Sequence, residues 1–360
     1  MTLPSTMRAM VTMGHGDIDQ IVQHDDWPRP SPKAGEVLVR VGACGLNNTD
    51  VNTRSGWYSK TVTSATTGDG FDTVGHDDPT WGGAPITFPR IQGADVCGEI
   101  VAVGTTVDPA RIGERIISDN WLRDIDDPGD MNKTGYFGSE RDGGFAEYTT
   151  MPASNAVPVR SDFSDAELAT FSCSYSTAEG MLARANVTNT DTVLVPGASG
   201  GVGGGLVQLA KRRGARVIAM ASEPKHDDVR ALGADRVIPR APADLRVAVG
   251  DERITVVADV VGGPYWTHLI DILERGGRYT CSGAIAGPMV ELDLRTFYLR
   301  DLTFTGSTVI PPQIMRDLVR YIEDGKIRPA LAATYRLEDL REAQAAFISK
   351  THTGNIVVCP

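Results

Sequence analysis

The sequence has little that would support a disulfide framework, a zinc ribbon or nucleic-acid binding. Its five cysteines, at positions 44, 97, 173, 281 and 359, are scattered and form no Cys-x-x-Cys pair. This pattern indicates neither a disulfide-bonded scaffold nor a structural zinc site. The formal net charge is −11 and there is no compact run of basic residues. We therefore expect no nucleic-acid partner, because such proteins gain most of their affinity from Lys and Arg at phosphates.

Long apolar runs are also missing. No stretch approaches the roughly twenty residues that a membrane helix needs, and residues 1–13 lack a secretory apolar core. We expect no membrane partner and a cytoplasmic location. The 360 residues, 41% of them hydrophobic, are sufficient for two globular domains.

A glycine-rich run is the most informative feature that is present. Gly197-Ala198-Ser199-Gly200-Gly201-Val202-Gly203 follows the strand-like residues 193–195 and opens a helix-like segment that reaches Arg213. Glycine has no Cβ atom to block a tight turn, a pyrophosphate close to the backbone, or close packing of a helix on a strand. Because a helix N-terminus also attracts negative charge, the run predicts a dinucleotide-binding site.

The flanking segments support this prediction. A strand candidate at residues 216–220 follows the helix, which completes the strand-helix-strand unit that parallel sheets require. The helix would direct one apolar face toward the sheet, formed by Val202, Leu206, Leu209 and Ala210. We predict that the cofactor contacts Ala198, Ser199, Gly200, Gly201, Val202, Gly203 and Gly283.

The end of the second strand favours NADP(H) over NAD(H). An acidic residue there would bind the ribose 2′-hydroxyl and repel a 2′-phosphate, but the position holds Ala221. Ser222 can donate a hydrogen bond, and Lys225, with His226 beside it, can supply positive charge. The nearby acidic residues weaken this preference: Glu223, Asp227 and Asp228. We predict that Ser222 and Lys225 contact the cofactor.

The pattern of the chain predicts two domains. Residues 1–158 read as mainly β, with short alternating strands such as 36–41 and 98–103. Residues 159–300 alternate between strands and helices, which is typical of a parallel α/β sheet. Residues 301–360 are expected to return to the first domain. The segments expected in the second half are helices at 166–184, 265–275 and 313–324, and strands at 254–261, 277–283, 302–308 and 356–359.

One segment shows no regular periodicity. Residues 59–88 are rich in Gly, Thr, Asp and Pro. A stretch of this length in a compact domain is typical of a lid, a binding loop or a disordered insert.

Several short motifs carry a family resemblance. They are Gly45-Leu46-Asn47-Asn48-Thr49-Asp50, Gly93-Ala94-Asp95, Gly143-Gly144-Phe145-Ala146-Glu147-Tyr148, the glycine-rich run, Asp259-Val260-Val261-Gly262-Gly263, Gly276-Gly277-Arg278 and the terminal 352–357. In order and spacing they resemble the medium-chain dehydrogenase/reductase superfamily, and within it the zinc-independent quinone oxidoreductase branch. The resemblance implies an α/β fold: a GroES-like, mainly β catalytic domain and a Rossmann domain with a doubly wound parallel sheet. It also implies a homodimer or homotetramer with an active site between the two domains.

The resemblance also bears on zinc. The positions that match the family's three catalytic zinc ligands hold Asn47, Ala94 and Cys173. One thiolate cannot hold a catalytic zinc, which normally has three protein ligands. Residues 118–142 lack the four cysteines of the family's structural zinc lobe, and His76 lies in the polar segment 59–88. We therefore expect no metal.

Without a metal, the favoured chemistry is hydride transfer to a conjugated acceptor, which spreads the developing charge itself. Asn47 and Tyr58 are the catalytic candidates, as hydrogen-bond donors to the acceptor oxygen; Tyr58 matches the family's Gly-x-Tyr motif. Asp50 and Asp95 are interpreted as structural hydrogen-bonding groups more readily than as proton-transfer groups. An apolar acceptor pocket could involve three aromatic residues, Trp57, Phe71 and Trp81.

The leading hypothesis is an NADPH-dependent oxidoreductase acting on a small molecule: a quinone, an enone or an enoyl thioester. Two alternatives stay open at this point. One is a zinc-type alcohol dehydrogenase using His76 and Cys173. The other is an NADPH-binding sensor or structural protein with little catalysis.

Overall fold

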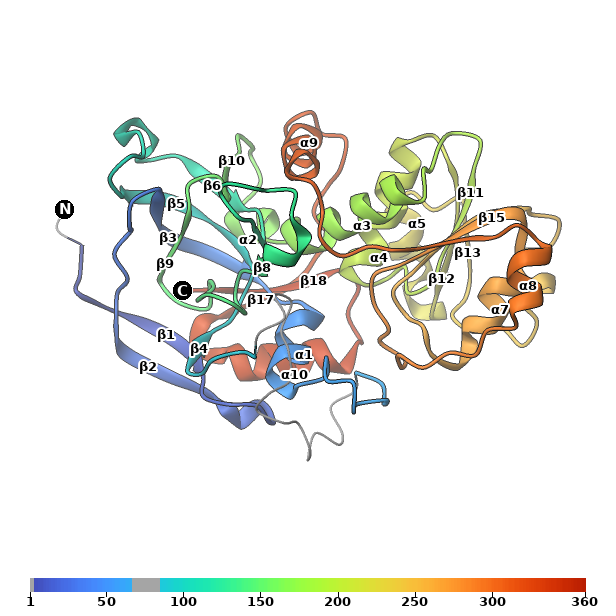
Figure 1. The fold of residues 1–360 in the computed structure, drawn as a ribbon, viewed down its shortest axis with the longest axis horizontal. Coiled ribbons are helices and arrows are strands. Elements are labelled where there is room, and N and C mark those ends of the chain that lie inside the picture. The colour runs from blue at the N-terminus through green and yellow to red at the C-terminus, as the bar shows by residue number, and fades with distance from the viewer. Residues whose placement is uncertain (1–2, 67–84) are drawn as a thin grey trace.

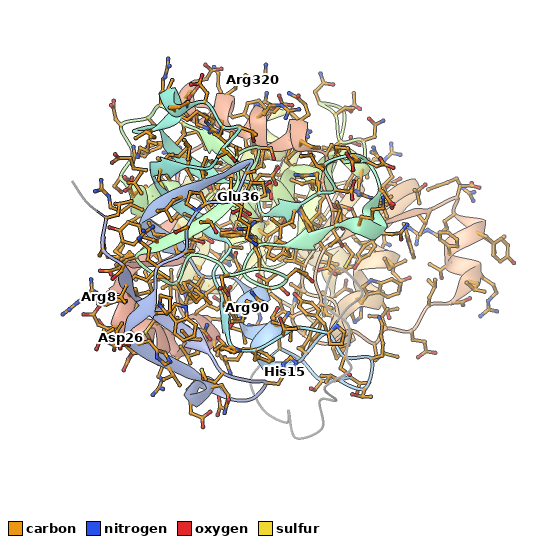
Figure 2. The ribbon with its side chains drawn as sticks, turned by 60° about the vertical axis from the view of Figure 1, so that its left-hand side comes forward. Arg8, His15, Asp26, Glu36, Arg90 and Arg320 are labelled. Atoms are coloured by element: carbon orange, nitrogen blue, oxygen red, sulfur yellow. The ribbon has the colours of Figure 1, made fainter. Side chains whose placement is uncertain are left out.

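The computed structural model describes residues 3–66 and 85–360. Figure 1 shows two lobes, one built mainly of strands and one with helices packed around a parallel sheet. Charged side chains such as Arg8, Asp26 and Arg320 lie toward the outside of the molecule (Figure 2). Within the described ranges, no helix is both long enough and apolar enough to cross a bilayer.

The parallel sheet has six strands in the order β13-β12-β11-β14-β15-β16, and every neighbouring pair is parallel. Numbered along the chain, this order is 3-2-1-4-5-6, that of a doubly wound dinucleotide-binding fold. The predicted Rossmann fold is therefore confirmed. The strands are β11 Thr192–Val195, β12 Arg216–Ala221, β13 Arg236–Pro239, β14 Ile254–Asp259, β15 Leu273–Cys281 and β16 Thr303–Gly306.

Helices pack on this sheet through apolar side chains, except α8 (Leu294–Leu299), which buries no residue. In α4 (Gly201–Arg212), Leu206, Leu209 and Ala210 are fully buried, as their spacing predicted. Val202 is only partly buried because it stands in the first turn, beside the cavity described below. The other helices of this half are α3 Ser172–Arg184, α5 His226–Ala231, α6 Leu245–Val249, α7 Trp266–Asp271, α8 Leu294–Leu299 and α9 Pro312–Glu323.

The other lobe centres on a seven-stranded sheet. Its long strand β3 (Glu36–Gly45) pairs antiparallel with β5 (Asp95–Val103), β9 (Tyr148–Pro152) and the C-terminal β18 (Asn355–Cys359). β17 (Leu331–Arg336) then pairs with β18, so the chain end returns to the first lobe. The remaining elements are β1 Thr6–Thr12, β2 Ile21–Pro28, β4 Arg90–Ile91, β6 Arg115–Ser118, β7 Trp121–Leu122, β8 Gly135–Tyr136, β10 Ala156–Pro158, α1 Asn48–Ser55, α2 Asp165–Leu168 and α10 Leu340–Ser349.

The structure differs from the sequence prediction at three boundaries. The helix expected at 265–275 ends at Asp271, and β15 already begins at Leu273. The helix expected at 166–184 is divided into α2 and α3, and in the break the Thr170 hydroxyl donates to the Glu167 carbonyl (2.7 Å). The parallel sheet also continues past residue 300, the predicted end of its domain. Its last strand, β16, places Phe304 against Tyr279 of β15, with ring centroids 5.5 Å apart. This contact is between distant residues, so local periodicity does not reveal it.

Candidate active site

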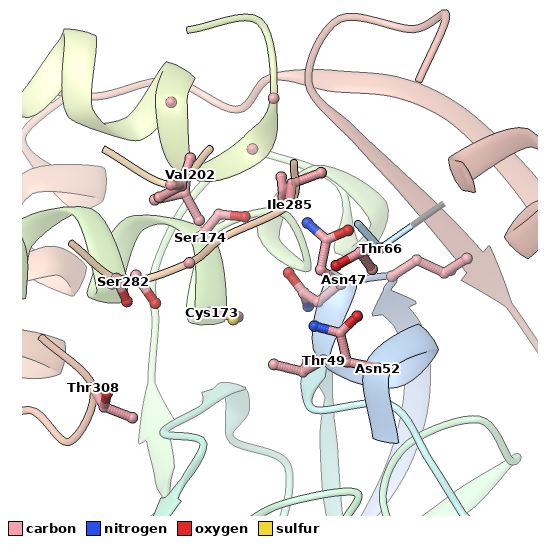
Figure 3. A pocket seen from close by; sticks show the side chains of 18 of the residues that line it. Asn47, Thr49, Asn52, Thr66, Cys173, Ser174, Val202, Ser282, Ile285 and Thr308 are labelled. Atoms are coloured by element: carbon pink, nitrogen blue, oxygen red, sulfur yellow. The ribbon is translucent and has the colours of Figure 1, made fainter. Parts of the chain in front are cut away.

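A cavity lies between the two lobes and is lined by residues from both. Figure 3 shows Asn47, Thr49 and Asn52 on one side, with Ser174 and Val202 across from them. Seven of the predicted site residues line it, namely Asn47, Tyr58, Gly200, Gly201, Val202, Gly203 and Gly283. Four do not: Ala198 is fully buried in the core, and Ser199, Ser222 and Lys225 lie outside the lining.

The glycine cradle, Gly197–Gly203, forms the wall that belongs to the parallel sheet. Gly197 adopts a left-handed φ of +66°, which lets the chain turn sharply after β11. Gly203 packs so closely that a Cβ atom there would meet the Gly197 carbonyl oxygen at 2.2 Å. The helix N-terminus that follows Gly200 has first-turn N–H groups without intrahelical acceptors. Such a cradle fits the pyrophosphate of a dinucleotide.

The ends of two adjacent strands meet where the adenosine ribose of such a cofactor would lie. Ala221, the last residue of β12, pairs with Pro239, the last of β13. Arg240 therefore comes next to Ser222, although the two residues are 18 positions apart in the sequence. Arg240 is exposed and has no ion pair within residues 3–66 and 85–360. Sequence reasoning missed it, because only strand pairing brings it to this edge.

Lys225, predicted to contact the cofactor, has partners within the protein. Its ammonium donates to the carbonyl oxygens of Lys350 (2.7 Å) and His352 (2.6 Å), in the turn between α10 and β18. Burial lowers the pKa of Lys225, and nearby Arg240 lowers it further. Two of its three N–H donors are thus already used within the protein.

Lys350, in the same turn, is a partly buried amine. Its Nζ donates to Asn48 Oδ1 (2.9 Å) and lies 3.6 Å from the centre of the Phe347 ring. Burial lowers its pKa from 10.5 to about 7, and the charge of Lys225 contributes. The folded protein therefore disfavours the charged form of this side chain.

This lowered pKa predicts a pH dependence of stability. Between pH 7 and 10.5, the unfolded chain binds a proton at Lys350 that the folded chain has released. The free energy of unfolding therefore rises with pH across this window, by about 2–4 kcal/mol. A Lys350→Met variant is expected to lack this contribution. Urea denaturation at pH 7 and pH 10 measures the free energy of unfolding of the natural protein, of Lys350→Met and of the control Lys326→Met, which changes an exposed residue. The same pH dependence in all three proteins would contradict the prediction.

Asn47 begins helix α1 at the opposite wall. Its backbone N–H donates to Asp50 Oδ2 (2.8 Å), which ties the helix N-terminus. Its side chain is buried, lies near enough to Asp95 to lower that carboxyl's pKa, and yet Nδ2 has no acceptor at hydrogen-bonding geometry among the described residues. A buried amide donor without a partner is costly, which suits a site completed by a ligand.

Tyr58 lies beyond the C-terminus of α1, after Gly56 in the left-handed conformation (φ +68°). The preceding Trp57 is anchored by its N–H to Asn52 O (2.8 Å) and by Nε1 to Ser64 O (2.9 Å). Burial raises the pKa of the Tyr58 hydroxyl, while a hydrogen bond with the Asn52 side chain opposes this. At neutral pH the hydroxyl is therefore protonated and able to donate.

Two residues of this wall were not predicted. Thr49 and Asn52 line the cavity from α1, and Thr49 Oγ1 and Asn52 Oδ1 have no partner in the described part of the chain. Their i, i+3 spacing places them on one helix face. Once residues 48–55 are assigned as a helix, this spacing predicts that Thr49 and Asn52 lie on the same face as each other.

Two buried carboxyl groups brace the base of the site. Asp95 Oδ1 accepts from Asn120 Nδ2 (2.7 Å) and from the Cys173 N–H (2.9 Å). Asp50 also accepts from the Gly93 N–H (3.2 Å). Burial raises the pKa values of Asp50 and Asp95 to about 7 and about 6, and hydrogen bonds limit both shifts. Both carboxyl groups accept hydrogen bonds from backbone N–H groups, as expected of the structural role that the sequence analysis favoured for them.

The comparisons with known proteins agree with this architecture. Residues 33–161 match the family described as alcohol dehydrogenase GroES-like domain, and residues 232–358 match the family described as zinc-binding dehydrogenase. A solved structure of a putative alcohol dehydrogenase from Sinorhizobium meliloti is 46% identical, with a TM-score of 0.89, and the match covers 99% of this chain and 98% of that one. The chain belongs to the medium-chain dehydrogenase/reductase superfamily of oxidoreductases.

Two curated relatives are similar over almost the whole chain. One is an acryloyl-coenzyme A reductase of Metallosphaera sedula, 28% identical over 98% of this chain and 99% of its own length. The other is an NADPH-dependent alkenal/one oxidoreductase, chloroplastic, of Arabidopsis thaliana, 25% identical over 100% of this chain and 81% of its own length.

The residues present fit a nicotinamide dinucleotide better than a zinc ion. The three positions of the family's zinc ligands hold Asn47, Ala94 and Cys173, so only the last has a metal-binding side chain. Burial raises the pKa of the Cys173 thiol, which disfavours the thiolate that a zinc ion needs. Across the ranges 3–66 and 85–360, no group of three His, Cys, Asp or Glu side chains could hold a metal ion. His76, the residue of the zinc alternative, lies outside the described residues, as do Phe71 and Trp81. Trp57 does line the cavity.

Proposed function

We propose that this protein is an NADP(H)-dependent reductase of quinones or α,β-unsaturated carbonyl compounds that works without zinc. One observation carries the proposal. The Asn47 amide is buried in the cavity, and its Nδ2 has no hydrogen-bond partner in the described chain. The glycine cradle forms the opposite wall of that cavity. An amide donor there can stabilise negative charge on a carbonyl oxygen, as a metal would. The names of the two relatives, an enoyl thioester reductase and an alkenal reductase, support the same acceptor chemistry.

A nicotinamide bound in the cradle would supply the hydride. Asn47 and Tyr58 donate hydrogen bonds to the acceptor oxygen, where the negative charge develops. For an enone, the β carbon gains the hydride and the α carbon then takes a proton from water. Trp57, Val260 and Ile285 give the cavity apolar walls that limit access of water and strengthen these hydrogen bonds.

Three groups support the choice of NADP(H). Ser222 and Lys225 follow β12, Arg240 follows β13, and no acidic residue ends β12. The nearby Asp227 is paired with Arg230, which offsets its charge. An exposed guanidinium is well suited to a 2′-phosphate, because it can donate two parallel hydrogen bonds.

An acceptor panel tests the function. Oxidation of NADPH and of NADH is followed by absorbance with quinones, enones, an enoyl thioester and simple aldehydes, before and after dialysis against a chelator. We expect turnover of conjugated acceptors with NADPH, unchanged by the chelator. Turnover of simple aldehydes that stops on metal removal would instead support a zinc alcohol dehydrogenase, and tight NADPH binding without turnover would support a sensor. The homodimer or homotetramer implied by the family stays a prediction.

Replacing Tyr58 by Phe should lower kcat about tenfold and leave the Kd for NADPH within about twofold. One neutral hydrogen bond contributes about 1 kcal/mol, and this one forms with the acceptor, not with the cofactor. Stopped-flow reduction of the best acceptor and fluorescence titration of NADPH measure the two quantities. The matched control is Tyr335→Phe, on β17 and away from the cavity lining. An unchanged kcat would remove Tyr58 from the mechanism.

A further inference from the structure

The cavity wall formed by Asn47 and helix α1 carries three buried polar atoms without protein partners. Asn47 Nδ2, Thr49 Oγ1 and Asn52 Oδ1 have none at hydrogen-bonding geometry among residues 3–66 and 85–360, and all three side chains line the cavity. Asn47 and Asn52 are each only 6% exposed. Figure 3 shows the three side chains entering the cavity from this wall. Since unpaired buried polar atoms are costly, we expect a ligand that fills the cavity to satisfy them.

The three atoms need different partners. Asn47 Nδ2 is a donor, so the carbonyl oxygen of an acceptor molecule satisfies it. Asn52 Oδ1 is only an acceptor, so a carbonyl oxygen cannot satisfy it, whereas an O–H or N–H group can. The Thr49 hydroxyl can pair with either kind of group. A plain enone or quinone therefore leaves Asn52 Oδ1 without a partner.

Tyr58 identifies which end of the Asn52 amide is left over. Burial raises the pKa of the Tyr58 phenol, and a hydrogen bond with the Asn52 side chain lowers it, as an N–H donor to the phenol oxygen does. Nδ2 is therefore the end that engages Tyr58, and Oδ1 is the end without a partner in the described chain. The same turn is held by its backbone, because the Trp57 N–H donates to the Asn52 carbonyl (2.8 Å).

Contacts between the two lobes close this end of the cavity. The backbone N–H of Thr66, a residue that is 3% exposed, donates to the carbonyl oxygen of Ile285 in the other lobe (2.8 Å). Trp57 Nε1 holds the same segment through the Ser64 carbonyl (2.9 Å). Trp57, Thr66 and Ile285 all line the cavity. An acceptor bound here displaces water from Asn52, so the bound molecule itself has to supply the donor.

We propose that Asn52 is a specificity-determining residue that selects conjugated carbonyl compounds with a hydroxyl or N–H group close to the carbonyl. The carbonyl oxygen accepts from Asn47 Nδ2, and the neighbouring O–H or N–H donates to Asn52 Oδ1. A site built around a substrate donor discriminates against the analogue that lacks it, because the buried acceptor is then left unpaired. The inference rests on the proposed reductase function and narrows its substrate class.

The test compares two cyclohexenones of similar size, one with a hydroxymethyl group on the α carbon and one with an ethyl group there. With NADPH, we expect kcat/KM of the natural protein to be about 10- to 100-fold higher for the hydroxymethyl compound. Asn52→Leu has a similar volume but no acceptor, so its preference should fall to within about threefold, with the Kd for NADPH changed less than about twofold. This variant also corrects for the different intrinsic reactivity of the two rings. Asn132→Leu, at an exposed position, should keep the natural preference.

Equal kcat/KM for the two enones in the natural protein would overturn the proposal, as would the same preference in Asn52→Leu. A Kd for NADPH that rises in Asn52→Leu while the preference stays would also overturn it, since Oδ1 would then bind the cofactor.

The corresponding saturated ketones keep the test independent of turnover and of the variant's folding. They bind without reacting, and titration calorimetry with NADP+ present measures their affinities for the natural protein. We expect the hydroxymethyl ketone to bind more tightly, and a Kd no lower than that of the ethyl ketone would overturn the proposal. Absence of turnover across the acceptor panel, together with a tighter hydroxymethyl ketone, would reject the reductase function and leave the specificity of the site supported.

Discussion

Replacing Asn47 by Ala is expected to lower kcat for a conjugated acceptor by about 100- to 1,000-fold, the usual cost of losing a donor to a developing oxyanion. The buried Nδ2 has no acceptor at hydrogen-bonding geometry among the described residues, although the side chain influences the nearby Asp95 carboxyl, so an acceptor oxygen in the cavity can complete its hydrogen bonding. Asn47 lies on the wall opposite the cradle, so the Kd for NADPH should change by less than about threefold.

The control variants separate catalysis from folding. Asn47→Asp keeps the shape of the side chain but replaces the donor with an acceptor, and it should be as impaired as Asn47→Ala. Asn132→Ala, at an exposed position, should have the kcat of the natural protein. The backbone N–H of residue 47 still donates to Asp50 in Asn47→Ala, so the helix start is kept and thermal denaturation should detect only a small change in stability. If Asn47→Ala keeps its kcat, the amide does not replace a metal and the proposed mechanism fails.

Replacing Gly203 by Ala is expected to weaken binding of the nicotinamide cofactor about 10- to 100-fold and to destabilise the protein by about 1–3 kcal/mol. The added Cβ would lie 2.2 Å from the Gly197 carbonyl oxygen and 2.7 Å from Ala198 Cα. Both are backbone atoms, so the cradle itself must move, and the first-turn N–H groups of α4 move with it.

Gly200→Ala is the matched control, three residues earlier. Its φ of −83° suits any residue, and a Cβ there comes only within 3.6 Å of the Gly197 oxygen. The protein's stability should therefore be nearly unchanged in Gly200→Ala, with a smaller loss of affinity than in Gly203→Ala. Fluorescence titration of NADPH and thermal unfolding of the three proteins measure both effects. Equal affinities in the two variants would show that the close packing of Gly203 does not hold the cradle.

Much of the fold could be predicted because it depends on local patterns. The strand-helix-strand unit around Gly200 follows from apolar periodicity and from glycines at a turn, both of which are properties of neighbouring residues. The sequence also shows, once the family resemblance is recognised, that Asn47 and Ala94 stand at two of the family's zinc-ligand positions. The break between α2 and α3 and the extent of the parallel sheet were not predicted, because contacts such as that of Phe304 with Tyr279 join residues far apart in the chain.

The candidate site divides in the same way. Gly200, Gly201 and Gly203 are recognised from their spacing, whereas the proximity of Arg240 to Ser222 depends on the pairing of β12 with β13. Lys225 shows the limit of sequence reasoning: it does follow the second strand as predicted, but the carbonyl groups of the 350–352 segment hold its ammonium.

The sequence by itself determined which chemical groups are available here: a glycine-rich turn after the first strand, an amide at the position of the family's first zinc ligand, and no acidic residue at the end of the second strand. Only the tertiary structure decided which of these groups share a cavity and which cations lack a counter-ion. The physical reason is that side-chain chemistry and backbone freedom are properties of single residues. Charge pairing and burial depend instead on distances that the pairing of remote strands creates, as when the pairing of β18 with β3 brings the turn 350–354 against both Asn48 and the cradle.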